Sequence, residues 1–140
     1  MERETESPEE TEAAAAELAA GLDAGDVVLV SGELGAGKTT WVRGACRALG
    51  VTEPVTSPTY TIGHVYLGRR GGDPLEVAHL DLYRLGRLED EDPALLEDYL
   101  TPARVGFVEW PAEGAAGLGR VRARVRLRHR GEGRRTVEVL

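Results

Sequence analysis

The chain has 140 residues, with 17 basic against 24 acidic side chains and a formal charge of −7 at pH 7. This length is typical of one domain, and a hydrophobic fraction of 41% is enough for a modest core, so we expect residues 1–140 to form a single domain. No apolar run is long enough to span a bilayer, and the acidic N-terminal segment lacks the hydrophobic region of a signal peptide. The single cysteine, Cys46, excludes a disulfide framework. This composition predicts a cytoplasmic protein without a membrane partner.

The basic side chains are distributed unevenly. Sixteen of them are arginines and one, Lys38, is a lysine. Because lysine is used at this position alone, the segment around Lys38 is a candidate for a specific role. Residues 120–135 contain eight arginines and one acidic residue, whereas residues 1–30 contain nine acidic residues and one arginine. The acidic total argues against nucleic-acid binding by the whole surface, but a local basic strip remains compatible with it.

The first half of the chain predicts a strand between two helices. The pair Ser7-Pro8 can cap and start a helix that reaches about Leu22. The apolar run Val27–Val30 is typical of a strand buried on both faces of a parallel sheet. A glycine-rich loop, Gly32–Gly37, follows this strand and leads into a helix that ends near Leu49.

The second half is richer in strands. A turn over residues 68–73 is expected to join two of them, and acidic residues 89–92 open a short helix that reaches about Leu100. The expected strands cover residues 62–67, 75–80, 104–109, 120–130 and 136–140. The alternation of strands and helices predicts an α/β fold, with a mostly parallel sheet flanked by helices and antiparallel strands at the C-terminus.

Residues 32–39, GELGAGKT, match the phosphate-loop pattern GxxxxGK[ST] at every specified position. In such a loop the backbone N–H groups and the N-terminal end of the following helix bind phosphate oxygens. Lys38 is expected to reach the β- and γ-phosphates, and the Thr39 hydroxyl can ligate Mg²⁺. The alternative, a glycine-rich hairpin turn, leaves the only lysine unexplained. The loop therefore predicts a P-loop NTPase-like domain that binds a nucleoside triphosphate.

A phosphate loop also needs a carboxylate near the metal, usually at the end of a neighbouring strand. Asp81 ends one predicted strand and Glu109 ends another. Both therefore stand where the carboxyl edge of an open α/β sheet binds its ligand. One of them could hold Mg²⁺ while the other orients the attacking water.

Two features leave alternatives open. His79 lies two residues before Asp81, on the same face of the strand, and suits either a core hydrogen-bonding role or a catalytic one. In residues 120–130 arginines alternate with mostly apolar residues, which predicts a strand with one basic face. That face is either simply solvated or a docking surface for RNA or an acidic partner.

Four segments in order resemble the TsaE (YjeE) family: GELGAGKTT at 32–40, SPTYT at 57–61, HLDLYRL at 79–85 and VEWP at 108–111. This family is the bacterial ATPase of tRNA threonylcarbamoyladenosine biosynthesis. A generic phosphate-loop enzyme would share only the first segment. The chain departs from the family at Glu33, where the family usually has aspartate.

The resemblance implies a small ATPase that binds ATP or ADP with Mg²⁺ and hydrolyses ATP weakly by itself. Its partners would be the catalytic subunit of the threonylcarbamoyl transferase and that subunit's non-catalytic paralogue, with tRNA reached through the complex. It would support or reset the transferase during modification of the adenosine beside the anticodon.

The resemblance also implies a set of site residues. Asp81 and Glu109 would be the catalytic acids and, with Thr39, the metal ligands, Glu109 having the stronger link to the metal. The segment 57–61 would be a switch-like loop near the γ-phosphate. The nucleotide would be bound by Thr11, Gly32, Gly35, Ala36, Gly37, Lys38, Thr39, Thr40, Thr61 and Trp110.

Two other functions use the same residues. In the first, nucleotide only switches a binding module and hydrolysis is incidental. In the second, the chain is a small P-loop kinase, which would need an acceptor pocket and usually an arginine-rich lid. The acidic segment 88–100 counts against such a lid.

Overall fold

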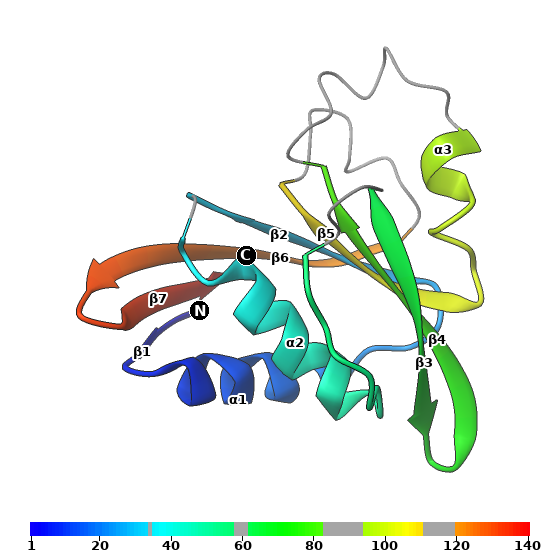
Figure 1. The fold of residues 1–140 in the computed structure, drawn as a ribbon, viewed down its shortest axis with the longest axis horizontal. Helices are drawn as coiled ribbons and strands as arrows, with labels where there is room; N and C mark the ends of the chain where they lie inside the picture. Colours follow the sequence, from blue (N-terminus) through cyan, green and yellow to red (C-terminus); the bar gives the residue numbers. More distant parts are fainter. Residues whose placement is uncertain (34, 58–61, 83–93, 111–119) are drawn as a thin grey trace.

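The computed structural model describes residues 1–33, 35–57, 62–82, 94–110 and 120–140. Its strands and helices form one seven-stranded sheet with helices against it (Figure 1). In chain order the elements are β1 (Glu2–Thr5), α1 (Pro8–Ala19), β2 (Asp26–Gly32), α2 (Lys38–Ala48), β3 (Gly63–Arg70), β4 (Asp73–Asp81), α3 (Ala94–Glu97), β5 (Arg104–Glu109), β6 (Arg120–Gly131) and β7 (Arg134–Val139).

The centre of the sheet is parallel and its margins are antiparallel. The strand order is β1-β7-β6-β2-β5-β4-β3. Strands β6, β2, β5 and β4 pair in parallel, whereas β7 pairs antiparallel with β6, β1 with β7, and β3 with β4. This arrangement confirms the predicted α/β fold with antiparallel strands at the C-terminus. The run Val27–Val30 is buried throughout, as its position in the middle of the sheet requires.

Apolar side chains pack on both faces of the sheet. On one face, α1 and α2 lie side by side, and Trp41 of α2 meets Phe107 of β5 edge-on, with ring centroids 6.1 Å apart (Figure 1). On the other face, Leu96 of α3 packs with residues of β2, β4 and β5. No helix among the described residues is long and apolar enough to cross a membrane.

The predicted element boundaries differ from the structure in a few places. Helix α1 starts at Pro8 as expected, with the Ser7 hydroxyl accepting from the Glu10 N–H at 3.2 Å, but it ends at Ala19 rather than near Leu22. The acidic start expected for the next short helix, residues 89–93, lies outside the described residues, and α3 begins at Ala94.

The turn expected over residues 68–73 was wrong in its length. Strands β3 and β4 continue until Arg70 pairs with Asp73, so that the turn itself is Gly71-Gly72. Gly68 lies within β3, and a Cβ at this position would stand 2.3 Å from the Leu49 carbonyl oxygen at the end of α2. This glycine allows two backbones to approach closely and does not mark a turn.

Strand β1 was not expected from the sequence. Its four residues, ERET, show no apolar alternation because β1 is an edge strand, which among the described strands pairs with β7 alone. Its last residue is nevertheless buried, and the Thr5 hydroxyl lies 2.7 Å from the hydroxyl of Thr11 in α1. This contact ties the edge of the sheet to the first helix.

A close helix contact predicts a stability change at Gly44. A Cβ there would stand 2.4 Å from the Glu12 Cα and 2.4 Å from the Glu12 carbonyl oxygen, so α1 would have to move away. Although alanine normally favours a helix over glycine, we expect Gly44→Ala to lower the free energy of unfolding by about 1–3 kcal/mol. Urea denaturation measures the change. Gly21→Ala is the control, since the nearest atom to its Cβ would be 3.7 Å away. Equal stabilities of the two variants would contradict the close contact.

The thiol of Cys46 is fully buried in α2. Burial raises the pKa of this thiol to about 12, because the thiolate would lack solvation. We therefore expect native protein to resist alkylation by iodoacetamide at pH 8.5 and unfolded protein to react. The unfolded thiol ionises first, so this group lowers the free energy of unfolding as pH rises from about 9 to 12. Rapid labelling of the native chain would contradict this burial.

Candidate functional site

The phosphate-loop segment connects β2 to α2, as its sequence predicts. Lys38 is the first residue of α2, and only 5% of it is exposed. Its ammonium nitrogen Nζ donates to the carbonyl oxygens of Gly32 and Glu33, each at 2.8 Å. The only lysine of the chain therefore lies folded back over its own loop.

The indole ring of Trp110 packs against the ammonium group of Lys38. The Lys38 Nζ lies 3.9 Å from the centroid of the indole ring, a distance typical of a cation–π contact. Trp110 has a φ of 54°, a left-handed conformation that costs a non-glycine residue about 1–2 kcal/mol. The backbone N–H of Trp110 donates to the Val30 carbonyl oxygen at 3.0 Å, and this hydrogen bond connects the end of β5 to β2. The backbone strain is thus associated with a ring placed over the lysine.

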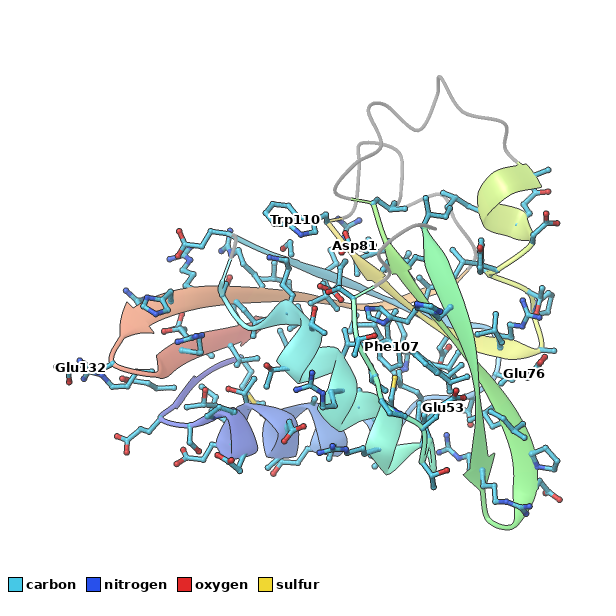
Figure 2. The ribbon with its side chains drawn as sticks, viewed as in Figure 1. Glu53, Glu76, Asp81, Phe107, Trp110 and Glu132 are labelled. Atoms are coloured by element: carbon cyan, nitrogen blue, oxygen red, sulfur yellow. The ribbon has the colours of Figure 1, made fainter. Side chains whose placement is uncertain are left out.

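The two predicted acids stand side by side. Asp81 and Glu109 are register partners at the carboxyl ends of the parallel strands β4 and β5. In Figure 2, Asp81 and Trp110 lie at the same edge of the sheet, whereas Glu76 lies far from it. Glu109 is 2% exposed, while Asp81 is partly exposed. The Glu109 carboxylate is therefore buried in the protein, whereas the Asp81 carboxylate is partly accessible to solvent.

Glu109 is the centre of a hydrogen-bonded chain. The Thr39 hydroxyl donates to both carboxylate oxygens of Glu109, at 3.1 and 3.2 Å. The same hydroxyl lies 2.7 Å from the hydroxyl of Ser57. Because the Thr39 hydroxyl has one proton, Ser57 must be the donor in the second contact. The start of the segment 57–61 is thereby linked to the phosphate loop, and Thr61 lies outside the described residues.

His79 holds the opposite side of the same carboxylate. Its Nε2 contacts the Oε2 of Glu109, and the imidazole ring is fully buried. An ionised carboxylate can only accept, so Nε2 is the donor. The other ring nitrogen, Nδ1, has no hydrogen-bond partner among the described residues. Of the two roles left open for His79, this geometry supports the hydrogen-bonding one.

A cavity of about 340 Å³ opens over these groups. The predicted residues Gly35, Gly37, Lys38, Thr39, Thr40, Asp81, Glu109 and Trp110 line it, together with Ser57 and Arg135. Other predicted nucleotide-binding residues are not among its described lining. Gly32 is the last residue of β2, Ala36 is buried, and Thr11 is buried with its hydroxyl against Thr5. Direct contact of these three with a nucleotide stays a prediction.

Arg135 is the lining residue that the sequence did not single out. It belongs to β7, and its Nε lies 3.4 Å from the position a Gly37 Cβ would take. The final strand was expected to start at residue 136, which left Arg135 outside it. Arg135 stands two residues before Val137 and four before Val139, so it shares their face of β7, and this period-2 spacing is the signal that could have found it.

Burial and charge act against each other on Lys38. Burial lowers the pKa of its ammonium group, because the charged form loses solvation. The negative charges of Glu109, Asp81 and Glu33 oppose this shift, in that order of strength. Glu33 also accepts a hydrogen bond from the His129 N–H of β6 at 3.3 Å. The cavity thus combines one buried cation with several acids around it.

The pairing of His79 with Glu109 predicts a coupled effect on stability. His79→Leu should remove the buried imidazole donor from the Glu109 Oε2 and leave that oxygen the Thr39 hydroxyl at 3.2 Å, which should cost about 1–3 kcal/mol of unfolding free energy. The double variant His79→Leu/Glu109→Leu should cost clearly less than the sum of the two single variants. Urea denaturation of all four proteins measures this coupling. Additive costs would show that the two side chains do not interact.

Comparison with known proteins places these features in one family. Residues 5–137 match the family described as "Threonylcarbamoyl adenosine biosynthesis protein TsaE". The protein of Treponema pallidum named "tRNA threonylcarbamoyladenosine biosynthesis protein TsaE" is 36% identical over 118 residues, which are 84% of each chain. The Streptomyces coelicolor protein of the same name is 44% identical over 110 residues, 79% of this chain and 73% of that one.

A solved structure agrees with the sequence relatives. The crystal structure of Bacillus subtilis YdiB superimposes with a TM-score of 0.73 at 31% identity, covering 98% of this chain and 82% of that one. The family match spans nearly the whole chain, including the loop of Lys38 and the strand ends that carry Asp81 and Glu109. The chain therefore belongs to the TsaE family.

Proposed function

We propose that this chain is the Mg²⁺-dependent ATPase component of the cytoplasmic system that forms threonylcarbamoyladenosine in tRNA. The observation that supports it best is the group of Lys38, Thr39, Asp81 and Glu109 around one cavity at the carboxyl edge of a parallel sheet. This is the position at which open α/β sheets bind ligands. The named relatives supply the biological setting, since they are called tRNA threonylcarbamoyladenosine biosynthesis proteins.

The triphosphate would take the place of contacts that the loop now makes with itself. The Lys38 ammonium donates to two carbonyl oxygens, and phosphate oxygens are stronger acceptors for the same donors. Trp110 covers the ammonium and limits its access to water. Arg135 lines the same cavity and could add a second positive charge from β7.

The donor set fits a magnesium ion that binds together with a nucleotide. Thr39 and Glu109 present oxygen atoms, and Asp81 lies beside them. Within the described parts of the chain, no group of three His, Cys, Asp or Glu side chains could hold a metal alone. Mg²⁺ commonly binds through one or two carboxylates together with substrate phosphates. When bound, the ion would neutralise charge that develops on the phosphates.

The protein groups have separate tasks in hydrolysis. Glu109 is held rigidly by His79 and Thr39, so it can orient a ligand without first moving. Asp81, more exposed to the cavity, can accept a hydrogen bond from the attacking water. Lys38 and Arg135 would stabilise negative charge on the transferred phosphoryl group.

The partners would be the catalytic transferase subunit and its non-catalytic paralogue, with tRNA brought by the complex. We expect slow ATP turnover by the purified chain and faster turnover after both proteins and substrate tRNA are added. Phosphate release, measured in each mixture, tests this. The stimulation should disappear with Lys38→Ala. Equal turnover in all mixtures, with no complex formed, would contradict this assignment.

Loss of the lysine should weaken nucleotide binding directly. Lys38→Ala removes a charge-assisted hydrogen-bond donor, so ATP affinity measured by calorimetry should fall by about 1.5–3 kcal/mol, roughly ten- to a hundredfold. Arg47→Ala is the matched control, because it removes an exposed cation from the far end of the same helix. Unchanged ATP affinity in Lys38→Ala would mean that the loop does not bind phosphates.

One observation favours a second function, that of a nucleotide-dependent binding switch. The hydrogen bond between Thr39 and Ser57 links the phosphate loop to the segment 57–61, so nucleotide could change that segment without hydrolysis. Glu109→Gln separates the two functions. If turnover is abolished while tRNA modification by the complex continues, the chain acts as a switch. Phosphate transfer only after an acceptor is added would instead indicate a kinase.

A further inference from the structure

Four arginines of β6 share one face of the sheet. Arg124, Arg126, Arg128 and Arg130 alternate with Val125, Leu127 and His129 along the strand. Val125 and Leu127 are buried in the core beneath α1 and α2. Because successive side chains of a strand point to opposite faces, the four arginines point away from these helices. We call these four residues the arginine row.

The arginine row is open to solvent in the described structure. Arg124, Arg128 and Arg130 are exposed, and the side chain of Arg126 is 43% exposed. Both long helices lie on the other side of β6 and β7, and α3 lies at the opposite end of the sheet (Figure 1).

Little of the positive charge in the row is neutralised. Arg126 pairs with Glu138 of β7, and Arg130 donates to the Thr136 hydroxyl at 2.7 Å. Within the described part of the chain, Arg124 and Arg128 form no ion pair. In a chain of net charge −7, the row is therefore a local basic strip. At physiological salt the Debye length is about 8 Å, so an anion that contacts the row interacts with its charges before salt screens them.

We propose that the arginine row binds the sugar–phosphate backbone of RNA. Alternate residues of a strand are about 6.7 Å apart, a spacing comparable to that of successive phosphates in an extended nucleic-acid strand. The guanidinium group binds phosphate oxygens in a fork of two hydrogen bonds. A single row of such groups suits a linear polyanion.

An acidic protein surface fits the row less well. Stable protein interfaces usually have buried apolar or aromatic anchors at their centre. The exposed large hydrophobic residues of the described chain are Val65 and Leu67 on β3, at the far edge of the sheet, and the terminal residues Met1 and Leu140. Leu140 adjoins the row, since its N–H donates to the Arg124 carbonyl oxygen at 2.8 Å, but one terminal leucine does not make an apolar centre. The row itself contains only charged side chains. That the RNA is the tRNA being modified rests on the proposed function, whereas binding of a phosphate backbone does not.

The test compares two pairs of substitutions that change the net charge equally. Fluorescence anisotropy of labelled tRNA, without nucleotide and at several KCl concentrations, gives the affinity and its salt dependence. Arg124→Gln/Arg128→Gln should weaken binding about tenfold and reduce the slope of log K against log salt by about 1.4–1.8. The control, Arg47→Gln/Arg69→Gln, removes two exposed arginines elsewhere and should bind like the unchanged chain.

The outcomes separate this inference from the proposed function. The inference would be overturned if both double variants lost tRNA affinity equally. It would also be overturned if the unchanged chain did not bind tRNA at 50 mM KCl. Row-dependent binding of polyglutamate without row-dependent binding of tRNA would overturn it as well, and would indicate an acidic protein partner. ATP affinity should be the same in both arginine variants. Lys38→Ala should lose ATP affinity but retain tRNA binding. ATP binding by the loop and RNA binding by the arginine row are therefore tested independently of one another.

Discussion

The candidate site depends on a buried carboxylate at the end of a central strand. Only 2% of Glu109 is exposed, so the protein itself must supply most of its hydrogen-bond donors. His79 of β4 supplies one and Thr39 of α2 supplies another. Satisfying one side chain therefore fixes the relative positions of β5, β4 and the start of α2. The lysine, the second acid and the tryptophan are arranged around this fixed point.

Much of the fold and several of the site residues could be predicted because they obey local rules. The run Val27–Val30 is apolar at every position, as a strand covered on both faces requires. Lys38 stands in a pattern whose spacing is set by the geometry of a loop around phosphates. Asp81 and Glu109 were expected at one edge because parallel strands end together, and the register places them opposite one another.

The remaining features depend on contacts between distant parts of the chain. The polar residues of β1 carry no pattern of their own, since an edge strand is defined by the neighbour with which it pairs. A glycine such as Gly68 is expected both in a turn and where two backbones approach closely. The sequence does not distinguish the two cases, because the second depends on where Leu49 lies in the fold. The sequence could place His79 near Asp81 but could not show that its ring faces Glu109. Arg135 reaches the cavity only because β7 folds back beside the phosphate loop.

The pairing of β1 with β7 has a consequence for how the protein is made. Among the strands that the structure describes, β1 has one neighbour, the C-terminal strand β7, with Glu2 opposite Glu138. During synthesis on the ribosome, β1 therefore has to wait until β7 has left the exit tunnel. Throughout that time its backbone N–H and C=O groups, like those of any unpaired edge, are available to other chains. The charged side chains of ERET disfavour pairing with other chains. The same polar residues that made β1 difficult to predict from the sequence therefore also reduce aggregation of the nascent chain.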